Sequence, residues 1–141
     1  MRYLKVIAQD QSANGQPDTL HFRSYEAEQL QREATQADLL GLKRLGTTYL
    51  KCAWYNAGEG EARHLRIFSP NPCADGTPKT VLLHFREGEK IAYKAAVHDL
   101  DNDGAYEVVL SSDVDNDGRA DRTDRRRVSS LVREFLKSGW W

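Results

Sequence analysis

Residues 81–97 read VLLHFREGEKIAYKAAV. Two apolar runs, Val81 to Phe85 and Ile91 to Val97, flank the charged and glycine-bearing segment 86–89. A short turn between two such runs is typical of a β-hairpin. This stretch therefore predicts two neighbouring antiparallel strands.

The same signals predict further strands on both sides of this hairpin. Runs of β-branched and aromatic residues are bounded by Gly, Pro, Asn or Asp, which favour turns. The expected strands are Met1 to Ala8, Thr19 to Phe22, Tyr49 to Tyr55, Arg63 to Phe68 and Tyr106 to Leu110. Residues 56–60 contain two glycines and would join the third and fourth of these strands as a second hairpin. Residues 10–18 and 69–78 have the Asn, Gly and Pro content of turns and loops.

Between the early strands and this second hairpin the composition favours a helix. Residues 24–45 are rich in Glu, Gln, Ala and Leu, which are good helix formers. Gly46 follows where a helix C-terminus often takes a left-handed residue. Thr35 and Asp38 resemble a capping pair, so the stretch is either one long helix or two short helices separated near Ala34.

A second helix is expected at residues 125–137. Its apolar residues recur at helical spacing and form one face, while basic residues occupy the rest. The apolar residues are Val128, Leu131, Val132, Phe135 and Leu136. A basic amphipathic helix can bind a membrane surface, an acidic partner or nucleic acid, but closure of the core by its apolar face is favoured here.

Together these elements predict a single α+β domain over residues 1–141. It has a mostly antiparallel sheet, one long or two short helices after the N-terminal strands, and a C-terminal helix.

The formal net charge of -1 provides no global field toward nucleic acid. No apolar run approaches the roughly 20 residues of a membrane-spanning helix. Cys52 and Cys73 lack zinc spacing; they form one disulfide or, as favoured, remain thiols.

Two acidic loops repeat each other at a spacing of 14 residues. Residues 99–107 read DLDNDGAYE and residues 113–121 read DVDNDGRAD. Both have carboxylates at relative positions 1, 3, 5 and 9, and glycine at position 6. Calcium takes about 6 to 8 oxygen ligands, and alternate side chains of a tight loop can supply several of them. The glycine permits the reversal that brings the carbonyl of position 7 toward the same ion.

This pattern predicts two calcium ions, one in each loop. Turns also use Asp, Asn and Gly without any metal, but the second copy and the acid at position 9 favour a cation. Without a cation, the converging carboxylates repel one another. The expected side-chain ligands are Asp99, Asp101, Asp103, Glu107, Asp113, Asp115, Asp117 and Asp121, and the expected carbonyl ligands are Ala105 and Arg119.

These loops resemble calcium loops of known families. Residues 96–110 look like the DxDxDGxxD or DxDxDGxxE loop of FG-GAP and VCBS-type repeats, which joins two strands of a hairpin. The second loop, with the helix after it, is similar to a dockerin or EF-hand loop. That resemblance implies a carboxylate at position 12, where this chain has Asp124. Position 12 of the first loop is Leu110, which cannot bind a metal.

The sequence thus favours a small calcium-stabilised binding or interaction module over an enzyme. Residues 98–124 form a tandem calcium-loop segment, and the ions orient the strand between the loops and the helix after them. One alternative is a hydrolase or lyase in which Glu59, Glu61 or His98 acts beside a metal. Another is a calcium sensor that exposes its C-terminal helix. Calcium is the expected partner and a protein partner is left open, with no membrane span and no nucleic acid expected.

The two indications of compartment disagree. The first residues lack the apolar stretch of about 7 to 15 residues that a secretory signal needs, which makes the cytoplasm the default. Structural calcium loops instead suggest a calcium-rich or extracytoplasmic compartment. The sequence leaves the localisation open.

Overall fold

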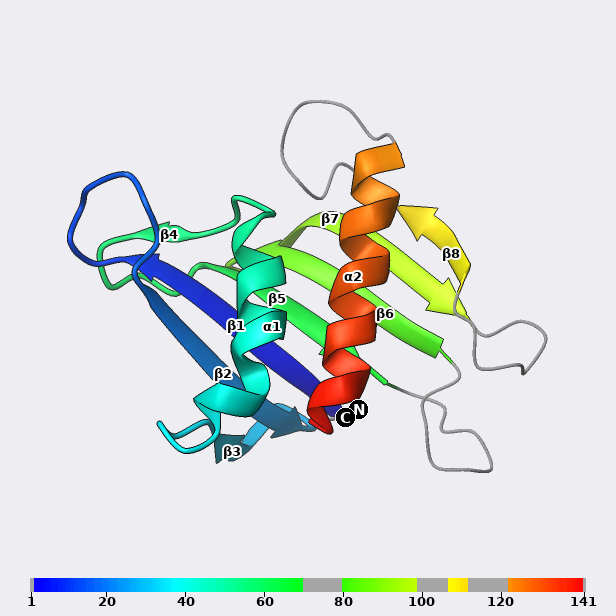
Figure 1. Cartoon of the computed structure of the whole chain (residues 1–141), viewed down its shortest axis with the longest axis horizontal. Coiled ribbons are helices and arrows are strands. Elements are labelled where there is room, and N and C mark those ends of the chain that lie inside the picture. Colours follow the sequence, from blue (N-terminus) through cyan, green and yellow to red (C-terminus); the bar gives the residue numbers. More distant parts are fainter. Residues whose placement is uncertain (1, 70–79, 99–106, 112–121, 141) are drawn as a thin grey trace.

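The computed structural model describes residues 2–69, 80–98, 107–111 and 122–140. These residues form one sheet and two helices, so the α+β class is confirmed (Figure 1). The strands are β1 (Arg2–Asp10), β2 (Thr19–Glu26), β3 (Gln29–Glu33), β4 (Asn56–Ala57), β5 (Arg63–Phe68), β6 (Thr80–Glu87), β7 (Lys90–His98) and β8 (Glu107–Ser111). The helices are α1 (Leu39–Leu50) and α2 (Arg122–Ser138).

The sheet is almost entirely antiparallel, as expected. Its strand order is β3-β2-β1-β5-β6-β7-β8, and the short β4 pairs in parallel with the end of β1. The hairpin predicted from residues 81–97 is β6 and β7, with Val81 opposite Val97 and Leu83 opposite Ala95. These pairs place buried apolar side chains directly across from one another, which fixes the register of the hairpin.

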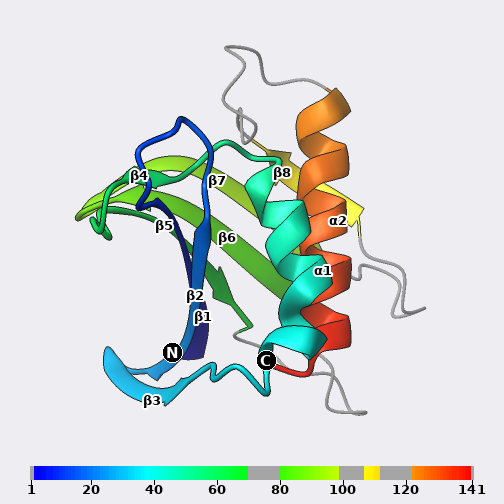
Figure 2. The same ribbon diagram turned by 60° about the vertical axis from the view of Figure 1, so that its left-hand side comes forward.

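Both helices cover the same face of the curved sheet (Figure 2). Alternate residues of the strands point toward them, such as Leu4, Val6 and Ala8 of β1. From α2, the apolar face contributes Val128, Leu131, Val132 and Phe135. Each of these four side chains is at most 1% exposed. The C-terminal helix therefore closes the core, as its amphipathic pattern predicted.

The helix expected from Ser24 is wrong in its first part. Residues 24–33 continue β2, turn at Ala27 and Glu28, and return as β3. Both turn residues have positive φ, 50° and 67°, as a tight two-residue hairpin turn requires. Tyr25 stacks on Tyr3 of β1 with ring centroids 5.1 Å apart. Pairing with β1 thus overrides the helical propensity of this segment.

The end of the helix was also predicted wrongly, because α1 continues through Gly46 to Leu50. Gly46 is buried against β2, and a Cβ at this position would lie 2.8 Å from Leu20 Cδ1. The glycine serves close helix-to-strand packing and does not end the helix. Tyr49, expected in a strand, is fully buried in the helix and donates a hydrogen bond to the Trp54 carbonyl at 2.7 Å. The predicted hairpin of residues 49–55 with 63–68 is therefore absent from the described residues.

The remaining predictions concern the cysteines and the membrane. Cys52 is fully buried in the core, whereas Cys73 lies outside the described residues. Among the helices that the structure describes, none is long and apolar enough to cross a membrane.

Candidate metal centre

Most of the predicted calcium ligands lie outside the described residues. These are Asp99, Asp101, Asp103 and Ala105 of the first loop and Asp113, Asp115, Asp117, Arg119 and Asp121 of the second. Glu107 is described as the first residue of β8, and Asp124 lies in the first turn of α2. The structure therefore describes the two loops only through the strands and the helix that flank them.

The first loop joins two paired strands. β7 ends at His98 and β8 begins at Glu107, and these two residues are opposite each other in an antiparallel ladder. Opposite residues in such a ladder have Cα atoms about 4.5 to 5.5 Å apart. The residue before position 1 thus lies beside position 9. β7 and β8 thus form a hairpin whose connection is residues 99–106.

The second loop connects a strand to a helix. β8 ends at Ser111 and α2 begins at Arg122. Asp124 is fully buried in the first turn of α2 and makes an interaction within the protein. A carboxylate at this end of a helix also faces the positive end of the helix dipole. The buried carboxylate of Asp124 thus lies at the end of α2 where the helix dipole favours a negative charge.

Residues 10–18, predicted as a turn, have the same arrangement of oxygen-bearing side chains. The segment reads DQSANGQPD, with Asp10 at position 1, Ser12 at 3, Asn14 at 5, glycine at 6 and Asp18 at 9. It joins β1 to β2 as residues 99–106 join β7 to β8. Sequence reasoning missed this correspondence because Ser and Asn replace two of the aspartates.

The 10–18 loop is ordered by its own hydrogen bonds. Asp10, which is 4% exposed, accepts hydrogen bonds from the backbone N–H groups of Asn14 at 3.2 Å and Gly15 at 2.8 Å. Asp18 accepts from the N–H groups of Gln11 at 3.1 Å and Ser12 at 2.9 Å. Hydrogen bonds from Ser12 hold the pKa of Asp18 well below its usual range. Two carboxylates are thus stabilised by N–H donors without a cation.

The described residues alone do not assemble a metal site. Among residues 2–69, 80–98, 107–111 and 122–140, no three His, Cys, Asp or Glu side chains are grouped to hold an ion. The 10–18 loop has only two carboxylates, whereas each DxDxDG loop has four. Because affinity for calcium depends on the charge of the ligands, and both carboxylates of the 10–18 loop already accept backbone N–H groups, this loop is not expected to bind calcium.

The hydrolase or lyase hypothesis named Glu59, Glu61 and His98, and each of these residues makes a contact within the fold. The Glu61 carboxylate forms an ion pair with Arg23. His98 Nδ1 lies 2.8 Å from the Thr80 hydroxyl, across the β6–β7 ladder. Glu59 has its backbone carbonyl bound by the Gln9 amide at 3.0 Å. The side-chain contacts of Glu61 and His98 favour roles in holding the sheet together, whereas the contact of Glu59 is made by its backbone.

His64 is the histidine most enclosed by its surroundings, with 3% of its surface exposed. Its Nε2 accepts a hydrogen bond from Arg66 Nε at 3.1 Å, so Nδ1 carries the proton and donates to the Ala62 carbonyl at 3.1 Å. Burial, together with the charges of Lys5 and Arg66, lowers the pKa of His64 to about 4. The imidazole is neutral at pH 7.

We expect His64 to make the fold sensitive to acid. Its pKa in the folded protein is below the unfolded value of about 6.5, so the unfolded chain takes up the proton first and acid favours unfolding. Stability is complete above pH 6.5 and decreases as the pH falls from 6.5 toward 4. With these two pKa values, the loss of stability from this group at pH 4.5 is about 2.5 kcal/mol. Urea unfolding of the wild type and of His64→Gln at pH 7 and at pH 4.5 measures this loss of stability.

The carboxylates titrate in both proteins and therefore cancel in the comparison. The variant is expected to lose less stability than the wild type over this pH interval. Equal losses in the two proteins would show that His64 does not carry the acid sensitivity.

Comparisons with protein-family models, with curated proteins and with solved structures found no match for this chain. The indications of the class of this protein are therefore its fold and its acidic loops. The described residues form an open, mostly antiparallel sheet with two helices on one face. The candidate metal loops lie at the two ends of its last strand, β8.

Proposed function

We propose that this protein is a calcium-binding interaction module in which residues 99–107 and 113–121 each bind one structural Ca²⁺ ion. The observation that carries the proposal is the repeated pattern of carboxylates at positions 1, 3, 5 and 9 with glycine at 6. Two copies of this pattern provide eight carboxylates within residues 99–121. A divalent cation in each loop offsets the repulsion that would otherwise oppose closing them.

The antiparallel pairing of His98 with Glu107 supports the first site. A hairpin holds the two ends of the loop close together before any ion binds. Part of the entropy cost of closing the loop is thereby met by the sheet.

The buried position of Asp124 supports the second site. This carboxylate is in the first turn of α2, just after the second loop, at the position where an EF-hand-like loop has its last ligand. The first loop has Leu110 at the corresponding position. We therefore infer that the second loop binds calcium more tightly than the first.

In this proposal the ions have a mechanical role. One ion fixes the end of the β7–β8 hairpin, and the other fixes the direction in which the chain enters α2. Because α2 supplies the apolar face that closes the core, the second ion links the loop to the stability of the whole fold. The module presents a surface whose shape depends on calcium.

Calorimetric titration of the metal-free protein with calcium tests the proposal and the order of the sites. Two binding events are expected in the wild type. Asp117→Ala removes the tighter event and Asp103→Ala removes the weaker one, because each deletes a ligand at position 5. Asp18→Asn, in the 10–18 loop, is the matched control and should leave both events in place.

Two results would contradict these expectations. Absence of calcium binding at millimolar concentration would exclude the proposed function. Loss of the tighter event in Asp103→Ala, with that event retained in Asp117→Ala, would reverse the order of the sites.

A further inference from the structure

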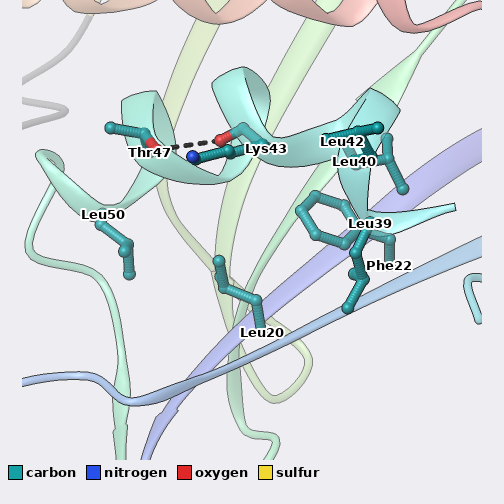
Figure 3. A pocket seen from close by; sticks show the side chains of 8 residues that line it. All are labelled: Leu20, Phe22, Leu39, Leu40, Leu42, Lys43, Thr47 and Leu50. Carbon is teal, nitrogen blue, oxygen red and sulfur yellow. Dashed lines mark hydrogen bonds between the residues drawn. The ribbon is translucent and has the colours of Figure 1, made fainter. Parts of the chain in front are cut away.

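An apolar groove lies between α1 and β2 (Figure 3). Its volume is about 430 Å³. This volume lies within the range of about 300 to 1,000 Å³ that small-molecule sites occupy. From β2 the groove is lined by Leu20 and Phe22, and from α1 mainly by leucines.

The leucines of α1 at this groove are unusually exposed. Leu40 is 84% exposed, Leu39 39% and Leu50 36%. Among the described residues, only one other large apolar side chain, Leu30 at 53%, is classed as exposed. Gathering of exposed apolar side chains around a hollow marks a binding site more often than scattered exposure does.

Close packing of α1 on β2 forms the floor of the groove. Gly46 of α1 packs directly on β2, where an added Cβ would lie 2.8 Å from Leu20 Cδ1 and 3.3 Å from Phe22 Cζ. The helix and the strand therefore cannot approach each other further. Leu42, which is fully buried, also lines the groove and ties it to the core. The contact of α1 with β2 thus sets the depth of the hollow.

One cation, Lys43, lines the groove. Its two polar lining residues are Lys43 and Thr47, and the Thr47 hydroxyl donates to the Lys43 carbonyl at 2.9 Å (Figure 3). The Lys43 ammonium is thus the polar group left to meet a ligand. Arg44 and Lys51 are nearby in sequence and exposed, and residues 39–51 contain no acid. Within the described part of the chain, none of these three cations has an ion pair.

From this combination we propose that the groove binds an anionic amphiphile of the fatty-acid type, a carboxylate attached to an aliphatic chain. The chain lies against the leucines of α1 and the apolar residues of β2. The carboxylate meets Lys43 at the rim. Charge complementarity selects an anionic head group, and the concave shape of the apolar surface favours a chain that enters it over a flat partner.

Dodecanoate, used below its micelle concentration, is the probe that tests this assignment. Titration of the full chain is followed by methyl NMR and by calorimetry. Dodecanoate is expected to shift the methyl signals of Leu20, Leu42 and Leu50. Dodecanol and dodecyltrimethylammonium have the same chain with a neutral or cationic head, and they are expected to bind more weakly.

Two substitutions at exposed positions separate the contributions of charge and chain. Lys43→Gln is expected to weaken dodecanoate binding about two- to fivefold, the usual strength of a surface ion pair. Leu40→Asp places a negative charge on the apolar wall and is expected to weaken binding at least about tenfold. Lys90→Gln, on the exposed side of β7, is the control and should bind as the wild type does.

Three outcomes would overturn the proposal. The first is no shift of the groove methyl signals with dodecanoate. The second is equal affinity of Lys43→Gln and wild type for all three amphiphiles. The third is self-association that Leu40→Asp abolishes without any dodecanoate binding, which would assign the groove to contact between copies of this chain. Calcium binding is measured separately, so failure here leaves the proposed function untouched.

Discussion

Calcium at about 100 times its dissociation constants is expected to raise the free energy of unfolding by about 5 kcal/mol, since each of two independent sites contributes about 2.7 kcal/mol. The thermal midpoint should rise by about 15 °C or more for a chain of this size. Both values assume that the ions bind only the folded protein. Scanning calorimetry of metal-free protein, in chelator and in millimolar calcium, measures the increment.

Variants of one loop at a time show how much each loop contributes to this calcium-dependent rise in the free energy of unfolding. Asp103→Ala and Asp117→Ala should each retain about half of it, and the double variant should lose it. Asp18→Asn is the control, because its loop is already held by N–H donors. Magnesium should stabilise less than calcium, since it requires a tighter octahedral shell and releases water reluctantly. Equal thermal midpoints in chelator and in calcium would refute a structural role for the ions.

The regular part of the sheet could be predicted from local pattern. The β6–β7 hairpin alternates buried and less buried residues along β6, and its turn contains Gly88 with a positive φ of 61°. The apolar stripe of α2 was equally clear. In these elements the sequence period and the buried face coincide.

The β2–β3 hairpin could not be predicted from its turn or its composition. Ala27 and Glu28 occupy positions where Asn and Gly are the usual residues, and β3 is exposed along its whole length. Its residues are good helix formers, so only pairing with β2 explains the strand. Gly46 was misread for a related reason, because its contact with Leu20 joins segments that are distant in sequence.

The candidate sites also differ in whether local sequence predicts them. A calcium loop has its ligands within about a dozen residues, so the sequence contains the pattern of residues 99–107 and 113–121. The 10–18 loop also had a local signal, but Ser and Asn in place of Asp hid it. The groove between α1 and β2 has no local signal, because its walls come from two segments that meet only in the fold.

Asp124 allows the link between the second loop and α2 to be tested directly. Asp124→Asn keeps the size of the side chain and removes its charge. If Asp124 binds calcium, the variant should lose about 2.7 kcal/mol of calcium-dependent stability. Amide hydrogen exchange of residues 128–136 should then be about 100-fold faster than in the calcium-bound wild type. Arg125→Gln, at the exposed neighbouring position, is the control.

The same measurement in chelator separates metal binding from the structural role of Asp124. If the carboxylate acts through calcium, wild type and Asp124→Asn should exchange at similar rates once calcium is removed. If it acts only by holding the first turn of α2, the variant should exchange faster by the same factor with and without calcium, and the proposed link would be refuted.

A calcium sensor would instead bind a hydrophobic dye more strongly when calcium is present, because α2 would be released from the core. Slower exchange of residues 128–136 in calcium, without added dye binding, is the result expected of a structural ion.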